Sequence, residues 1–341
     1  MRHQDGKVVI ICVYVDDLIM TGDDTTQIEE FKVIFSKRFE ITDQGELQYI
    51  VGLQVERTAT STFLHQSLYI ADLLDRSGFE DGKTNRSPLP AKTVTYKNEE
   101  NDAADATLYR SKVGQLMYAM LGTRPDMAFA ISQLAKQMQS PSTEHMKLVD
   151  YAIRYIKGTK NHGITYSYES ENNVDERRAA VVIKAYSDSD YAGDKADAKS
   201  QTGYIISLAN GPILWKSGKQ STVALSSAEA ELNAAMDCST DIVWCRNMLD
   251  FMGFPQSSPT HLYMDNTSAI QIAKNGNATK RSRHFNVKSF YVHEQITLEN
   301  VIPVYMKTDV LPADMLTKAL PGPQLRKHKD MMKVGSKSTS D

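Results

Sequence analysis

The stretch "AAVVIKAYSDSDYAGD", residues 179–194, is an apolar, β-branched run that ends in acidic residues. Such a run, bounded by polar residues, is typical of a buried strand. The segment "GYIISLANGPILWKSGKQ", residues 203–220, predicts two more strands joined by a turn around Asn210 and Gly211. We therefore expect Asp188 to end the first strand of a meander.

A long helix is predicted next, in "LSSAEAELNAAMDCSTDIVWCRNMLDFMGF", and two glutamates lie near its start. Ser226 and Glu229 have the spacing of a capping box, which gives Glu229 a structural explanation. Glu231 instead heads the apolar row that must lie against the sheet: Ala235, Cys238, Ile242, Cys245 and Leu249. An ionised carboxylate on a buried stripe is costly unless it is paired or bound to a metal. Glu231 is therefore the functional candidate.

Two further acidic residues follow predicted strands. Asp265 ends a short strand in "THLYMDNTSAIQIAKN", although Asp265 or Asn266 could also cap the helix that comes next. Asp314 follows the strand "VIPVYMK" and lies in the first turns of a terminal helix, where the helix dipole alone could account for it. Carboxylates at the ends of strands can converge with one on the helix packed across them. We expect Asp188, Glu231 and Asp265 to share a pocket, with Asp314 as a fourth candidate.

Clustered carboxylates without His or Cys ligands suit hard cations such as Mg²⁺ or Mn²⁺. Two such ions about 4 Å apart can activate a water and stabilise the leaving oxygen in phosphodiester cleavage. A basic run, "TKRSRHF", could hold phosphates near such a site or could form only a solvated loop face. Its basic residues are Lys280, Arg281, Arg283 and His284.

A second acidic strand end lies near the start of the chain, in "VVIICVYVDDLIMTGDD". The run from Val8 to Val15 predicts a well-buried strand that enters a hairpin with Asp16 and Asp17 at its tip. Asp-Asp is a poor two-residue turn, because the favoured turns place Gly or Asn at the second position. Adjacent carboxylates also repel unless a metal or a proton intervenes. A metal pair and a tight turn are both open interpretations.

The composition sets broad limits on the kind of protein. The chain has 341 residues, which is long enough for two domains, and its net charge of −3 neither favours nor excludes nucleic acid. Its three cysteines lack CxxC spacing and predict neither a disulfide framework nor a zinc site. No apolar stretch reaches the roughly 20 residues of a membrane span. We expect a soluble, intracellular protein.

The rest of the chain divides into recognisable segments. A helix beginning near Asp24, two strands and a helix that ends at Gly78 are predicted after the hairpin. Residues 81–107 read as a long loop or linker, and three helices follow up to Gly158. The charged stretch at residues 169–178 is the candidate domain boundary.

The chain resembles the C-terminal part of the Pol polyprotein of copia-type LTR retrotransposons over nearly its whole length. The resemblance rests on motifs that occur in one order, among them "YVDD", "GELQYIVGLQV", "YRSKVGQLMYAMLGTRPDMAFAISQL", "YSDSDYAGD", "ALSSAEAEL", "YMDNTSAI", "RHFNVKSFYV" and "PADMLTKAL". It implies the end of a reverse transcriptase followed by a ribonuclease H domain. Asp16 and Asp17 match the metal pair of the polymerase palm. The residues that match the four metal-binding acids of ribonuclease H are Asp188, Glu231, Asp265 and Asp314.

The resemblance also implies an α/β architecture. We expect a ribonuclease H-like domain at residues 180–320, with a five-stranded mixed sheet and flanking helices. A truncated α+β reverse transcriptase palm with the start of the thumb is expected at residues 1–80. A linker and helical thumb and connection region should occupy residues 81–168, and a flexible C-terminal tail residues 321–341.

The implied activity is metal-dependent hydrolysis of the RNA strand of RNA/DNA hybrids, with two Mg²⁺ or Mn²⁺ ions per site. The RNA-directed DNA polymerase remnant is expected not to polymerise alone, since the third palm aspartate lies outside this sequence. The rival hypothesis is a non-catalytic nucleic-acid-binding or assembly module of a decayed retroelement. Expected partners are nucleic acid, the missing part of a Pol polyprotein or a second copy, with no membrane. The expected location is the cytoplasm, in a virus-like particle, or the nucleus.

Overall fold

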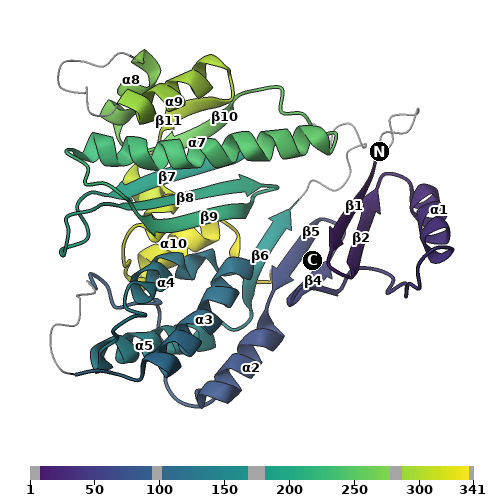
Figure 1. Ribbon diagram of the computed structural model, residues 1–341, viewed down its shortest axis with the longest axis horizontal. Helices are drawn as coiled ribbons and strands as arrows, with labels where there is room; N and C mark the ends of the chain where they lie inside the picture. Colours follow the sequence, from purple (N-terminus) through teal and green to yellow (C-terminus); the bar gives the residue numbers. More distant parts are fainter. Residues whose placement is uncertain (1–7, 94–101, 168–180, 277–285, 338–341) are drawn as a thin grey trace.

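The computed structural model describes residues 8–93, 102–167, 181–276 and 286–337 (Figure 1). Its largest unit is a five-stranded mixed sheet with the strand order β11-β10-β7-β8-β9. The strands β7 to β9 form the predicted antiparallel meander, and β10 and β11 run parallel to β7. The bounds are Lys184–Asp190 for β7, Gln201–Leu208 for β8, Gly211–Lys219 for β9, Thr260–Met264 for β10 and Val301–Tyr305 for β11.

Three helices cover one face of this mixed sheet, as Figure 1 shows. They are α7 (Ser227–Phe251), α8 (Thr267–Asn275) and α9 (Asn286–Thr297). The apolar row predicted for α7 is buried against the sheet, with Ala235, Cys238 and Ile242 at 0% exposure. The expected five-stranded mixed sheet with flanking helices is therefore confirmed.

The ends of these helices follow local rules that the sequence predicts. The Ser226 hydroxyl accepts a hydrogen bond from the Glu229 backbone N–H at 3.2 Å and caps α7. The Asn266 side chain accepts from the Ala269 backbone N–H at 3.0 Å and caps α8. Because Asn266 provides this cap, Asp265 is not needed for it.

The opposite face of the meander packs against the middle region through α4, which contacts β9, and the middle region contains the three predicted helices. These are α3 (Ala106–Gly122), α4 (Ala128–Ala135) and α5 (Thr143–Gly158). Their buried residues, among them Leu116, Ile131 and Ile156, share one hydrophobic core with Ile205 of β8 and Leu316. The helical region and the mixed sheet are thus joined by a common core, and the predicted boundary at residues 169–178 lies outside the described residues.

A second, antiparallel sheet has the strand order β12-β6-β5-β4-β3. It joins strands from distant parts of the sequence: β3 (Tyr49–Ile50), β4 (Leu53–Arg57), β5 (Ser61–His65), β6 (His162–Ser167) and β12 (Val334–Ser336). The helix α2 (Ser67–Ser77) follows β5 and ends at Gly78, whose φ of 68° is the left-handed conformation that favours glycine. Because β5 pairs with β6, the expected division after residue 80 crosses a continuous sheet.

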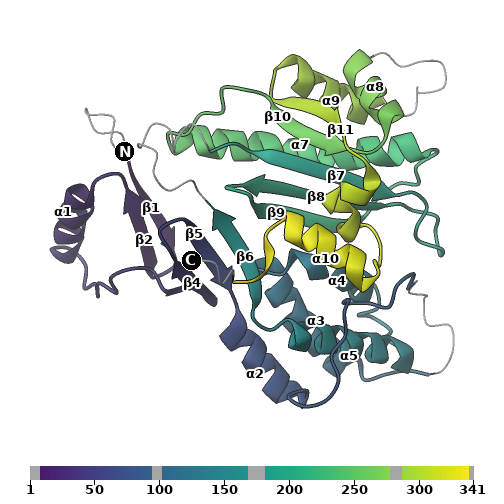
Figure 2. The same ribbon diagram turned by 180° about the vertical axis from the view of Figure 1, so that it is seen from behind.

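The expectation of a flexible tail at residues 321–341 is wrong for its described part. Residues Gly322–Met331 form helix α10, and β12 pairs with β6. Figure 2 shows α10 packed on the side of the mixed sheet away from α7. The physical reason is apolar burial, since Leu325, Met332 and Val334 are at most 3% exposed and belong to the common core.

The N-terminal hairpin also differs from its prediction. The strands β1 (Val9–Tyr14) and β2 (Asp17–Gly22) pair only with each other among the described strands, and α1 (Thr25–Ser36) follows them. The side chains of Val13 and Val15 are 69% and 86% exposed, so the expected well-buried strand is wrong. No helix in the described segments has the length and apolar content needed to cross a membrane.

Candidate metal centre at the end of the mixed sheet

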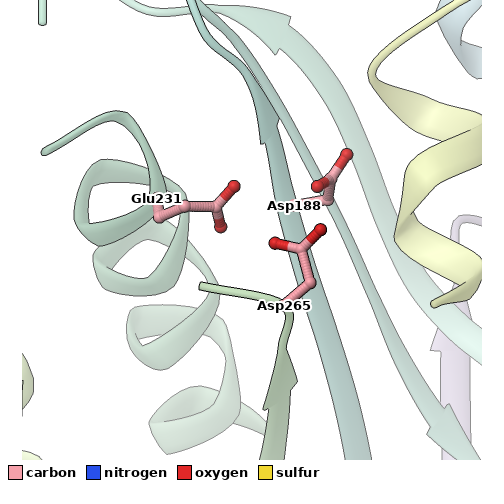
Figure 3. A group of neighbouring side chains, drawn as sticks. All are labelled: Asp188, Glu231 and Asp265. Atoms are coloured by element: carbon pink, nitrogen blue, oxygen red, sulfur yellow. The ribbon is translucent and has the colours of Figure 1, made fainter. Parts of the chain in front are cut away.

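Three carboxylates from three different elements converge at one end of the mixed sheet (Figure 3). Asp188 lies near the end of β7, Asp265 follows β10, and Glu231 lies in the second turn of α7. One oxygen atom from each can be chosen so that all three lie within 4.8 Å of one another. The convergence arises because β7 and β10 are parallel neighbours and α7 crosses them at this end.

Each of these carboxylates has a hydrogen-bond donor on one of its oxygens. Ser189 donates to Glu231 Oε1 from its backbone N and from its hydroxyl, at 3.0 Å each. The Thr317 hydroxyl donates to Asp188 Oδ2, and the Thr308 hydroxyl donates to Asp265 Oδ2 at 2.5 Å. These donors fix the orientation of the carboxylates. The prediction that Asp188, Glu231 and Asp265 lie together agrees with this arrangement.

Burial gives the site unusual electrostatics. Asp188 and Glu231 are 3% and 4% exposed, and burial raises the pKa of Asp188 to about 7. Burial, followed by repulsion from Asp188 and Asp265, also raises the pKa of Glu231 well above its usual range. Without a cation, the structure disfavours full ionisation of these groups.

The donor set fits a hard divalent cation. Glu231 Oε2 is buried and has no hydrogen-bond partner among the described residues, whereas its other oxygen is held by Ser189. A buried carboxylate oxygen left without a partner is costly, and a cation would offset that cost. Carboxylate oxygens are the ligands that Mg²⁺ and Mn²⁺ prefer.

The fourth candidate, Asp314, is placed differently. It lies in a short 3-10 helix, Pro312–Leu316, with its side chain fully buried, and it raises the pKa of Asp188 by repulsion. Its Oδ1 forms an ion pair with Lys318, and its Oδ2 accepts a hydrogen bond from Gln324 at 3.3 Å. Asp314 is therefore a neighbour of the three-carboxylate group. Its Oδ1 has the ion pair with Lys318 but no hydrogen bond among the described residues, and its Oδ2 has the hydrogen bond from Gln324.

The other predicted site residues lie elsewhere. Asp16 belongs to the turn of the hairpin and Asp17 begins β2, so only Asp16 lies at the tip. Figure 1 shows this hairpin on the side of the molecule away from α8 and α9. Within the described ranges, Asp188, Glu231 and Asp265 form the only group of three or more His, Cys, Asp or Glu side chains placed to share an ion. The basic residues at 280, 281, 283 and 284 lie outside the described ranges.

The residues that position the carboxylates were not predicted. They are Ser189, Thr308, Thr317 and Lys318. Ser189 directly follows Asp188, and Thr308 lies shortly after the end of β11. These positions are only weak sequence signals for a residue that orients a carboxylate. Thr317 and Lys318 follow Asp314 closely, but only the folded chain shows that Thr317 contacts Asp188.

The chain has clear relatives among known proteins. Residues 1–91 match the reverse transcriptase (RNA-dependent DNA polymerase) family. The retrovirus-related Pol polyprotein from transposon TNT 1-94 of Nicotiana tabacum is 33% identical over 94% of this chain, and that from transposon RE1 of Arabidopsis thaliana is 34% identical over 93%. The chain spans 24% and 21% of those two proteins. An uncharacterized mitochondrial protein of Arabidopsis thaliana is 32% identical over 69% of the chain and 93% of its own length.

These matches give the chain a reverse transcriptase region at residues 1–91 and relate most of the chain to retroelement proteins. The chain is similar over most of its length to the retrovirus-related Pol polyproteins of transposons, as the resemblance of its motifs predicted. Among solved structures, LC11-RNase H1, isolated from compost by a metagenomic approach, is 16% identical. The match covers 40% of this chain and 92% of that one, with a TM-score of 0.32.

Proposed function

We propose that Asp188, Glu231 and Asp265 bind Mg²⁺ or Mn²⁺ and that the site hydrolyses the RNA strand of RNA/DNA hybrids. One observation carries the proposal: the Glu231 carboxylate converges with two further carboxylates, and its buried Oε2 lacks a hydrogen-bond partner among the described residues. The reverse transcriptase match and the similarity to Pol polyproteins support nucleic acid as the substrate class. We further propose that residues 180–320 act as the ribonuclease H domain of this chain.

The three carboxylates would hold the cation, which would supply Lewis-acid stabilisation of the charge that develops on the phosphate. Ser189, Thr308 and Thr317 orient the carboxylates, so little reorganisation is needed when the site is loaded. Burial raises the pKa of Asp188 to about 7, so this carboxyl would give up its proton to serve as a cation ligand. Contacts to 2′-hydroxyls would distinguish RNA from DNA.

The test uses the purified chain and a hybrid whose RNA strand is labelled at its 5′ end. We expect RNA cleavage in Mg²⁺ and none in EDTA, with products that carry 3′-hydroxyl and 5′-phosphate ends. Asp265→Asn should lower the rate by about 100-fold or more. The matched control is Asp250→Asn, since Asp250 is an exposed carboxylate on α7. Equal loss in both variants, or cleavage in EDTA, would contradict the proposal.

A second candidate is a non-catalytic nucleic-acid-binding or assembly module. The exposed apolar hairpin favours it, because Val13, Tyr14 and Val15 are each more than half exposed. This candidate predicts hybrid binding without turnover that does not change when Asp265 is replaced. We expect no templated DNA synthesis from this chain alone, and primer extension measures that directly.

A further inference from the structure

Asp314 and Lys318 form an ion pair beside the three-carboxylate group. The carboxylate of Asp314 is fully buried, whereas the side chain of Lys318 is 42% exposed. The ammonium contacts Asp314 Oδ1. On the other oxygen, Gln324 Nε2 donates at 3.3 Å and His328 Nε2 lies 3.9 Å away. Both oxygens of Asp314 therefore face groups of the chain itself.

The other three carboxylates contrast with Asp314. Asp188, Glu231 and Asp265 have hydroxyl or amide donors on one oxygen each and converge on a common space. None of them forms an ion pair with a lysine, arginine or histidine of the described residues. The chain thus leaves three carboxyl groups without an ion pair in the open group and pairs the fourth with Lys318.

We propose that Lys318 supplies a fixed positive charge to this site, so that the folded chain binds one divalent cation on Asp188, Glu231 and Asp265. Asp314 then holds Lys318 in place of a second ion. The inference rests on the proposed function and deepens it, because it replaces the two ions expected from the family resemblance by one ion and one ammonium group.

The physical argument is competition for one carboxylate. A second divalent ion at Asp314 must displace an ammonium group that is already paired with Oδ1, and it is repelled by that ammonium while the ammonium stays near. Asp314 and Lys318 are only four residues apart in the sequence. Their ion pair therefore forms within one local segment. Lysine is also a common point charge for phosphate groups.

The experiment counts ions directly. The full chain is titrated with Mn²⁺ alone, and free Mn²⁺ is measured by electron paramagnetic resonance. We expect one bound ion per wild-type chain. Lys318→Met frees Asp314 and should add a second ion, bound at least tenfold more weakly, and the double variant Lys318→Met with Asp314→Asn should return to one. Lys216→Met is the matched control, because Lys216 forms a 2.8 Å ion pair with Asp237 away from the site.

The inference is overturned by two ions on the wild-type chain or by a single ion on a folded Lys318→Met variant. If Lys318→Met does not fold, the wild-type count and Asp314→Asn decide, since Asp314→Asn should still bind one ion. Hybrid cleavage by a wild-type chain that binds two ions would overturn the role of Lys318 and leave the proposed function intact. A wild-type chain that binds no Mn²⁺ would overturn both.

Discussion

Ser189 donates two hydrogen bonds to the same oxygen of Glu231, one from its backbone N and one from its hydroxyl, each 3.0 Å long. The second oxygen of Glu231 is buried and lacks a hydrogen-bond partner among the described residues. Ser189 therefore fixes the orientation of a carboxylate that converges with those of Asp188 and Asp265. The chain accepts a destabilising arrangement at this point, which a cation would relieve.

Glu231→Gln should therefore stabilise the metal-free chain. The amide keeps the size of the side chain and removes the buried charge, so we expect the free energy of unfolding to rise by about 1–2 kcal/mol. Urea denaturation in EDTA measures it. Glu229 is the matched control, because its carboxylate accepts from the Leu225 backbone N–H at the start of α7. Glu229→Gln should instead lower stability, by about 0.5–1 kcal/mol. A destabilised Glu231→Gln variant would contradict the account.

Divalent cations should stabilise the wild-type chain against unfolding. At a Mg²⁺ concentration of 100 times its dissociation constant, the free energy of unfolding should rise by about 2.7 kcal/mol. Glu231→Gln should lose most of this increase, while Asp237→Asn, on the same helix but paired with Lys216, should keep it. Thermal denaturation across a Mg²⁺ series measures the effect. An increase of equal size in both variants would show that the ion binds elsewhere.

The raised pKa of Asp188 predicts a particular pH dependence. The folded chain binds this proton up to a pH of about 7, whereas an unfolded aspartate releases it near 3.8. The contribution of the Asp188 proton to the free energy of unfolding is therefore fully present below pH 3.8, and it is lost as the pH rises to about 7. In EDTA, Asp188→Asn should gain stability relative to wild type across this window. A stability difference that does not change with pH would contradict the assignment.

A buried ion network holds the helical region against the C-terminal helix α10. Asp126 is 1% exposed, pairs with Arg124 at 2.8 Å and lies 3.3 Å from Lys329 of α10. Asp126→Ala leaves two buried cations without their carboxylate, so we expect a loss of about 3–5 kcal/mol in urea denaturation. Asp72→Ala removes the exposed Arg76 pair and should cost about 0.5 kcal/mol or less. Similar losses of stability in the two variants would show that the buried network does not contribute more than an exposed ion pair.

The local features of this fold could be predicted because they depend on neighbouring residues. Ser226 and Gly78 end their helices as the sequence rules require. Separating Glu229 from Glu231 needed only helical spacing, and the structure places Glu231 with the other carboxylates. The strand ends that bring Asp188 and Asp265 together follow from parallel neighbours in one sheet.

The features that were not predicted depend on contacts between distant segments. The pairing of β12 with β6 joins residues 334–336 to residues 162–164, and no local pattern encodes it. An apolar run predicts burial, yet burial of the hairpin needs a partner that the described chain does not provide to Val13 and Val15. The hydroxyl of Thr317 reaches Asp188 from 129 residues away. Such contacts arise only from the packed fold.

The most direct test of the central claim is the single-turnover rate of RNA cleavage in an RNA/DNA hybrid, measured for the wild-type chain and for Glu231→Gln. The account predicts Mg²⁺-dependent cleavage by wild type and a rate lower by about 100-fold or more in the variant. Because Glu231→Gln should be at least as stable as the metal-free wild-type chain, unfolding would not explain the loss. Equal rates in the two proteins, or no cleavage by a folded wild-type chain that binds Mg²⁺, would contradict the account.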